Sequence, residues 1–108
     1  MINYIAYLRV STNEQANGGA GLNAQYDACQ AYALRTEGAV TAVYRDEGVS
    51  GSTGLEKRPG LLQAVGTLKK GDVLLVAKRD RLGRDVIKVA LIEAAIERKG
   101  ARVVSSAG

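Results

Sequence analysis

The fold is set by the stretch Tyr7-Leu8-Arg9-Val10-Ser11, which ends the first apolar run of the chain. An apolar run that stops at polar residues predicts a β-strand followed by a turn. Because side chains alternate along a strand, we expect Tyr7, Arg9 and Ser11 to point to one side of it. A buried arginine is costly without a matching negative charge, so we expect an anionic group to meet this row of side chains.

Hydrophobic periodicity divides the rest of the chain into alternating helices and strands. The expected elements are strands at 3–10, 40–44, 72–77 and 102–105 and helices at 22–37, 58–70 and 86–99. A helix separates each pair of successive strands, and a crossover of that length favours parallel pairing. The sequence therefore predicts an α/β fold, with a mostly parallel open sheet and helices on both of its faces.

Two details of the first two helices follow from the positions of glycine, proline and leucine. Gly38 is expected to cap the C-terminal end of the first helix, and Pro59 to lie in the first turn of the second. The second helix is expected to place four apolar side chains against the sheet, namely Leu61, Leu62, Val65 and Leu68.

The helix at 86–99 is apolar around almost its whole circumference. A helix of this kind is buried on more than one side. One interpretation makes it the central helix of the core. The other places its inner side on the sheet and its outer side on a partner or on a missing segment.

The composition excludes several kinds of chemistry. The chain has 108 residues, no histidine and a single cysteine, Cys29. The absence of histidine rules out Ser-His-Asp and Cys-His catalysis and histidine-bound metals. One cysteine cannot form an intramolecular disulfide, and it fits a reducing compartment. The net charge of +4 is weak evidence for a polyanionic partner.

No stretch of the sequence predicts export or membrane insertion. The start of the chain lacks the basic residues and cleavage site of a signal peptide, and no apolar run is long enough to span a membrane. We therefore expect a single cytoplasmic domain with one core.

Ligands of open parallel sheets bind beyond the carboxyl ends of the strands. Those ends carry Ser11 and the segments 46–50 and 78–84. The candidate residues are the hydroxyl of Ser11, the acids Asp46 and Asp80, and the arginines Arg9, Arg58, Arg81 and Arg84. Arginine binds phosphate oxygens in pairs and keeps its charge, so this set favours phosphoryl transfer to a serine. Without histidine, guanidinium groups and Asp80 are left to activate the weakly nucleophilic hydroxyl.

A more ordinary interpretation exists for the segment 78–84. Arg81 and Arg84 lie beside Asp80 and Asp85 in the sequence, as in a solvated loop held by surface salt bridges. Charge spacing alone favours this interpretation slightly over phosphate binding.

Two further ligands are weighed against phosphate. Asp46, Glu47 and Asp80 could hold Mg²⁺, although the neighbouring arginines disfavour a cation there. Residues 19–24 match the dinucleotide-binding pattern G-x-G-x-x-A, but they do not follow the strand directly. These glycines are interpreted as a mobile loop of the active site instead.

The order and spacing of the candidate residues resemble those of a known family. The matching motifs are Tyr7-x-Arg9-x-Ser11-Thr12, Gln25 in the first helix, Asp46-x-x-x-Ser50-Gly51, Arg58-Pro59-Gly60 and Asp80-Arg81-Leu82-Gly83-Arg84. The chain resembles the catalytic domain of serine recombinases, the group that contains resolvases, invertases and serine integrases. The resemblance extends over essentially the whole chain, and the motifs together are highly specific.

The resemblance implies a mechanism. Ser11 corresponds to the family nucleophile, which attacks a DNA phosphodiester and leaves a 5′-phosphoserine bond and a free 3′-hydroxyl. That linkage retains the bond energy, so the family needs no ATP, metal or other cofactor. Its phosphate-binding and activating arginines correspond to Arg9, Arg81 and Arg84, with Arg58 as a further contributor. Asp80 corresponds to an acid that transfers a proton or positions Arg81, and the residues that shape the pocket correspond to Tyr7, Gln25, Asp46 and Ser50.

The resemblance also implies partners. Full-length family members bind DNA, act as dimers and tetramers, and belong to bacterial, phage and other mobile elements. They continue into a further strand, a long helix and a DNA-binding domain. Residues 1–108 are therefore expected to be a catalytic-domain fragment that folds but does not recombine DNA, with no membrane partner and no nucleotide cofactor. A competing hypothesis is a catalytically silent module that pairs with an active subunit.

Overall fold

The computed structural model describes residues 1–12, 21–49 and 54–107. Within these ranges the chain forms one sheet of four strands, in the order β2-β1-β3-β4. The strands are β1 (Ile2–Val10), β2 (Gly38–Glu47), β3 (Val73–Val76) and β4 (Arg102–Ser105). Every neighbouring pair is parallel, which confirms the predicted parallel sheet.

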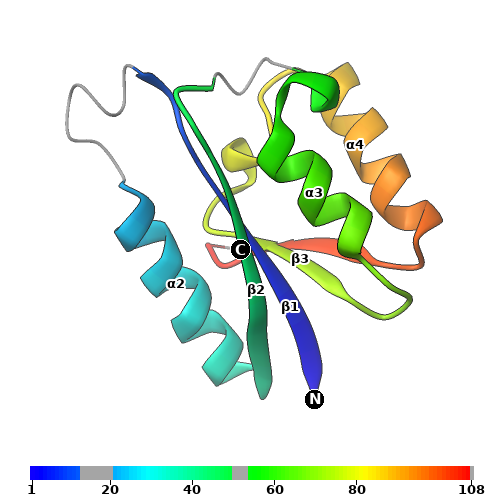
Figure 1. Ribbon diagram of the computed structural model, residues 1–108. Helices are drawn as coiled ribbons and strands as arrows, with labels where there is room; N and C mark the ends of the chain where they lie inside the picture. Colours follow the sequence, from blue (N-terminus) through cyan, green and yellow to red (C-terminus); the bar gives the residue numbers. More distant parts are fainter. Residues whose placement is uncertain (13–20, 50–53, 108) are drawn as a thin grey trace.

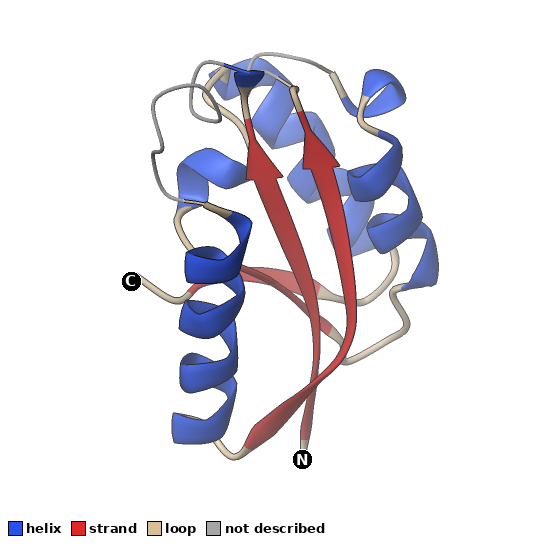
Figure 2. Ribbon diagram, turned by 60° about the vertical axis from the view of Figure 1, so that its left-hand side comes forward, coloured by secondary structure: helices blue, strands red, loops and turns tan. Residues whose placement is uncertain are grey.

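Helices cover both faces of this sheet. They are α2 (Leu22–Arg35), α3 (Pro59–Thr67) and α4 (Val86–Arg98), with two short 3₁₀ turns, η1 (Leu55–Lys57) and η2 (Arg79–Arg81). Figure 1 shows α2 on one side of the sheet and α3 with α4 on the other, and Figure 2 shows the same layers from a second direction. The strand order explains the division, because the right-handed crossover from β1 to β2 runs across the sheet in the opposite direction from the crossovers from β2 to β3 and from β3 to β4. Helix α2 therefore lies on one face, and α3 and α4 lie on the other.

The side chains of β1 alternate between two apolar cores. Tyr7 packs in the core under α3 and α4, together with Leu61 and Ile92. Leu8 packs in the core under α2, together with Cys29. All four residues of β3 are buried, as the continuous apolar run in its sequence predicted.

The prediction for Gly38 was wrong. Helix α2 ends at Arg35, and Glu37 takes the left-handed conformation after it, with a φ of 59°. Gly38 is already the first residue of β2, where an added Cβ would lie 2.4 Å from a ring carbon of Tyr4. The glycine is needed because the tyrosine ring passes close to the backbone, a cause that local sequence does not reveal.

The ends of β2 and α3 differ from the predicted ones. Strand β2 extends to Glu47 because its polar end still pairs with β1, with Arg9 opposite Asp46. Helix α3 ends at Thr67, earlier than predicted. Leu62 is 50% exposed on this helix, so its predicted inward position was wrong, although Leu61 is buried as predicted.

Helix α4 is buried on one side only. Ile92 and Ile96 face the core, whereas Val86, Ile87 and Leu91 are 82%, 74% and 66% exposed. The interpretation of α4 as a central core helix was therefore wrong. Among the described residues, no helix is both long and apolar enough to cross a membrane.

Candidate active site

The end of β1 is held by the buried side chain of Arg9. This guanidinium is only 1% exposed and donates to three backbone carbonyls. Its Nε reaches Arg81 O at 3.1 Å, its Nη1 reaches Val49 O at 2.8 Å, and its Nη2 reaches Asp80 O at 3.0 Å. Arg9 therefore ties together the chain after β2 and the turn η2, and Ser11 follows it half-buried at the end of the strand.

Gln25 hydrogen-bonds to the backbone of β1 at Arg9, past the point where the pairing of β1 with β3 ends. Strand β3 pairs with β1 only at Tyr4, Ile5 and Ala6, so the backbone of Arg9 has no strand on that side. The Gln25 amide fills this position, because Arg9 N donates to its Oε1 at 3.1 Å and its Nε2 donates to Arg9 O at 3.0 Å. Helix α2 thus fixes the strand end that carries Ser11.

The guanidinium of Arg81 binds the carboxylate of Asp80. Its Nε and Nη2 donate to the two oxygens of Asp80 at 3.0 and 3.3 Å, and its Nη1 donates to Arg9 O at 2.8 Å. Arg81 is only 5% exposed, so the interpretation of Arg81 as part of a solvated loop was wrong. A paired contact to two oxygens is also the way arginine holds phosphate.

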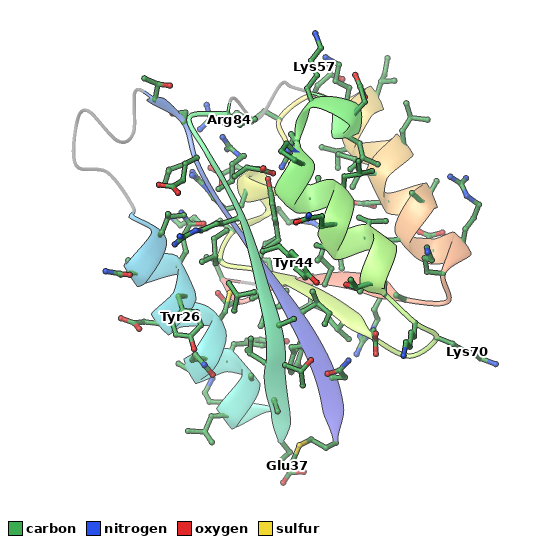
Figure 3. The ribbon with its side chains drawn as sticks, in the orientation of Figure 1. Tyr26, Glu37, Tyr44, Lys57, Lys70 and Arg84 are labelled. Carbon is green, nitrogen blue, oxygen red and sulfur yellow. The ribbon has the colours of Figure 1, made fainter. Side chains whose placement is uncertain are left out.

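Arg84 approaches the same carboxylate from the solvent. Its Nη2 lies 3.9 Å from Asp80 Oδ2, and its side chain is 63% exposed. Figure 3 places Arg84 at the end of the molecule where β1 and β2 finish. The solvated, salt-bridged description thus fits Arg84, whereas Asp85 caps α4 by accepting from Ile87 N and Lys88 N.

The arginines determine the charge state of Asp80. Partial burial raises the pKa of this carboxyl. Hydrogen bonds from Arg81 and the charges of Arg81, Arg84 and Arg9 lower the pKa by more than burial raises it. The net effect is a pKa below the ordinary value for aspartate. Asp80 is therefore a carboxylate at neutral pH, and it can accept a proton or a hydrogen bond there.

Arg58 lies entirely inside the molecule, with no exposed surface. Its Nε and Nη2 donate to the Tyr7 hydroxyl at 3.3 and 3.1 Å, and its carbon Cζ lies 5.3 Å from the centre of the Tyr7 ring. Its Nη2 also donates to Arg81 O at 2.7 Å, and its Nη1 donates to Leu82 O. Arg58 therefore stabilises η2 from the interior of the protein, through the backbone carbonyls of Arg81 and Leu82.

Asp46 connects this buried group to the start of α3. The Tyr7 hydroxyl donates to Asp46 Oδ2 at 2.7 Å. The same carboxylate accepts from Gly60 N at 2.8 Å and from Leu61 N at 3.1 Å, at the positive end of the helix. Burial raises the pKa of Tyr7 above its ordinary value, and Asp46 raises it further against the opposing effect of Arg58, so the phenol stays protonated.

Gly60, the last residue of the Arg58-Pro59-Gly60 motif, contributes to the site through its lack of a side chain. An added Cβ would lie 2.2 Å from Arg45 O, so only glycine lets α3 come close enough to meet Asp46. The available signal was the glycine that directly follows Pro59 at the start of the helix. Unusual residues in regular elements often mark such close approaches.

The structure brings most of the predicted residues to the carboxyl edge of the sheet. Arg9, Arg81, Asp80 and Arg58 meet at η2, while Tyr7 and Asp46 lie beneath it. Ser50 and the glycine loop at 13–20 lie outside the described residues. Gly21 is described, and it precedes the first residue of α2.

Asp46, one of the three acids considered as Mg²⁺ ligands, is engaged elsewhere in the fold, whereas residues 19 and 20 of the dinucleotide pattern lie outside the described residues. Both oxygens of Asp46 are used by Tyr7 and the start of α3. Across residues 1–12, 21–49 and 54–107, no three acidic or cysteine side chains gather as a metal site would require. Burial raises the pKa of Cys29 to about 11, so this thiol is protonated at neutral pH.

Fold and site together define a parallel α/β domain with a cationic group of side chains at the carboxyl edge of its sheet. The sequence pattern described as "Resolvase, N terminal domain" matches residues 4–108. The chain therefore belongs to the resolvase family, and it is a serine recombinase catalytic domain, as its motifs predicted.

Two relatives illustrate the match in sequence. The chain is 33% identical to the Transposon Tn2501 resolvase of Escherichia coli over 89 residues, which are 82% of this chain and 42% of the relative. It is also 33% identical over 96 residues to a DNA-invertase of Enterobacteria phage P7, covering 89% of this chain and 44% of the relative. The chain thus spans less than half the length of these relatives.

Solved structures show the same fold. The N-terminal catalytic domain of TP901-1 integrase superposes with a TM-score of 0.83 at 28% identity, covering 97% of this chain and 78% of that one. The C-terminal catalytic domain of ISC1926 TnpA, an IS607-like serine recombinase, gives a TM-score of 0.80 at 28% identity, covering 99% of this chain and 69% of that one.

Proposed function

We propose that Ser11 attacks a phosphodiester of DNA and becomes covalently joined to it. In this step the Ser11 Oγ forms a bond to phosphorus and gives its proton to Asp80. The bond from phosphorus to the 3′-oxygen breaks, and the leaving oxygen takes up that proton from Asp80. The products are a 5′-phosphoserine linkage and a free 3′-hydroxyl. The observation that carries the proposal is the buried Arg81 fork, which holds an anion beside the strand end that leads to Ser11.

Arg81 and Arg84 are the proposed contacts to the phosphate oxygens. Both lie on the Asp80 carboxylate, whose two oxygens resemble those of a phosphate in spacing and charge. A DNA phosphate that takes this position would displace the carboxylate from the fork. Negative charge that develops on the phosphate is then stabilised by guanidinium groups that remain charged at any relevant pH.

Asp80 is the proposed acceptor for the proton of Ser11. A serine hydroxyl is a weak nucleophile and needs a base or a stabilised alkoxide. The lowered pKa keeps Asp80 ionised, and displacement from Arg81 would free an oxygen lone pair. The positive charge of Arg9, placed two residues before Ser11, further favours the alkoxide.

Four buried residues are proposed to position this group. Arg58 donates to the backbone carbonyl of Arg81 in η2 and to the hydroxyl of Tyr7. Asp46 accepts from the backbone at the start of α3. Gln25 fixes the backbone of Arg9. All four lie at or below 4% exposed, as expected of residues that support the site from within the fold.

The proposed setting is site-specific recombination in a bacterial or phage mobile element. The relatives are a transposon resolvase and phage invertases, and they are about twice the length of this chain. We infer that DNA-site recognition and assembly into dimers or tetramers need further polypeptide. Residues 1–108 alone are expected to fold but not to recombine DNA.

The test uses a chimera in which residues 1–108 replace the matching part of the Transposon Tn2501 resolvase. The chimera is incubated with DNA that carries the site of that resolvase, and protein-linked DNA is separated on a denaturing gel. The unsubstituted chimera should bind the site and form a covalent adduct, whereas Ser11→Ala should bind equally well and form none. An adduct that persists in Ser11→Ala would rule out this nucleophile, and a catalytically silent module would give no adduct in either protein.

A further inference from the structure

A pocket of about 360 Å³ lies beside the Arg81 fork, on the α2 side of the sheet. Its walls come from the first turns of α2 and from the chain just after β3 and β4. Alanines form half of the lining, with Ala24 and Ala28 on α2 and Ala77 and Ala107 just after β3 and β4. Small side chains leave room for a ligand to approach the backbone closely.

The polar groups of the pocket are cationic or neutral. Lys78 and Arg81 supply two positive charges, Ser106 supplies a hydroxyl, and the Gln25 amide is already bonded to the backbone of Arg9. Among the residues that the structure describes, none that lines the pocket is acidic. The two cations have a fixed relation, because Arg81 N donates to Lys78 O at 3.0 Å at the start of η2. A pocket with this lining favours an anion over a cation.

Lys78 is the cation in this pocket that has no task in the fold. Its side chain is exposed and makes no hydrogen bond or ion pair within the described ranges of the chain. Arg81, in contrast, is tied to Asp80 and to the backbone of Arg9. Another lysine, Lys99, reaches Gly66 O at 3.4 Å and so supports the end of α3.

We propose that Lys78 binds a phosphate of the DNA backbone next to the phosphate at Arg81, with the sugar between them against the alanine walls. This inference rests on the proposed function, because it takes the ligand to be the same DNA strand. An ammonium binds phosphate as a point charge and reads no base, so the contact is independent of sequence. A pocket of about 360 Å³ is at the small end for ligand sites and suits one backbone unit rather than a base pair.

The salt dependence of DNA binding measures this contact directly. Each phosphate contact to duplex DNA contributes about 0.9 to the slope of log K against log salt concentration. The 108-residue chain is titrated with a fluorescent duplex between 50 and 200 mM salt, as are Lys78→Gln and Lys70→Gln. Lys70 carries the same charge but precedes β3, whereas Lys78 follows it, so the two lysines lie beyond opposite ends of this strand. Figure 3 shows Lys70 far from Arg84.

Lys78→Gln should reduce the steepness of the plot of log K against log salt concentration by about 0.9. The ratio of the affinity of the unsubstituted chain to that of Lys78→Gln should therefore fall about threefold to fourfold between 50 and 200 mM salt. Lys70→Gln should keep the slope of the unsubstituted chain. An unchanged slope in Lys78→Gln, an equal fall in Lys70→Gln, or no salt-dependent binding by the unsubstituted chain would overturn the proposal.

Two further measurements separate the possible sources of phosphate and the two proposals. Inorganic phosphate is titrated at constant ionic strength while the amide signals of Lys78 and Gln25 are followed by NMR. Saturable shifts with inorganic phosphate, together with an unchanged DNA slope in Lys78→Gln, would mean a site for free phosphate and would overturn the DNA assignment. Ser11→Ala should keep the full slope, so a failure of the covalent chemistry is distinguishable from a failure of the Lys78 contact.

Discussion

The arginines of this site divide by what their guanidinium groups hold. Arg9 and Arg58 donate to backbone carbonyls and are almost completely buried. Arg81 and Arg84 lie on a carboxylate, and Arg84 faces the solvent. The first pair therefore builds the turn η2, whereas the second pair is the one we propose to contact a phosphate.

The Tyr7 hydroxyl is the single link between Arg58 and Asp46, so Tyr7→Phe should destabilise the fold. Its removal leaves Arg58 short of one acceptor and Asp46 short of one donor in the core. An unsatisfied buried polar group costs about 1–3 kcal/mol, and we expect a loss of that size in the free energy of unfolding in urea.

Tyr26→Phe is the matched control, because Tyr26 loses the same hydroxyl on the exposed side of α2. Its free energy of unfolding should change by less than about 0.5 kcal/mol. Equal effects of the two substitutions would contradict the role given to the buried hydroxyl.

The lowered pKa of Asp80 predicts how its contribution to stability depends on pH. The folded-state pKa lies below the unfolded value of about 3.9, so this contribution is complete above about pH 5 and is lost as the pH falls through the folded pKa. Unfolding of the wild type and of Asp80→Asn in urea should therefore differ most at neutral pH and converge toward pH 2. A difference that stays constant or grows with acidity would be inconsistent with this charge pairing.

At the scale of elements, the docking of α3 depends on one glycine. Gly60→Ala would place a methyl group 2.2 Å from Arg45 O, so the helix would have to move away from Asp46. Overpacking of this kind costs about 1–3 kcal/mol. We expect a loss of at least that size in the free energy of unfolding, measured in urea.

Gly66→Ala provides the control within the same helix. An added Cβ there meets nothing within 4 Å, so helix propensity should decide the outcome. Alanine is favoured over glycine in a helix interior by about 0.5–1 kcal/mol, and the variant should be more stable than the wild type. Destabilisation by both alanines would show that general disturbance of α3, and not the close approach, is responsible.

The order of elements and their parallel pairing were predictable, because each depends on local periodicity and crossover length. The end of β2 was not, since Arg45, Asp46 and Glu47 are polar and give no strand signal. They join the sheet because Asp46 finds two amide donors in α3, a partner distant in sequence. Gly38 was misjudged for a similar reason, because the ring of Tyr4 lies on another strand.

For the whole molecule, the predicted parallel topology is sufficient to place the candidate residues at one edge of the sheet. The supporting contacts were not predictable, since Arg9 and Arg58 bind backbone carbonyls that every residue carries. The sequence does not show which backbone carbonyls accept a side-chain hydrogen bond. The sequence therefore identifies the charged side chains of the site, while their division into supporting and ligand-facing groups comes only from the fold.

The central claim is that Ser11 becomes bonded to DNA, and peptide mapping tests it most directly. The chimera is incubated with its DNA site, the products are digested with protease and nuclease, and the peptide that contains Ser11 is examined by mass spectrometry. The account predicts a nucleotide joined to Ser11 through its 5′-phosphate. A nucleotide found on any other residue, or joined through a 3′-phosphate, would contradict it.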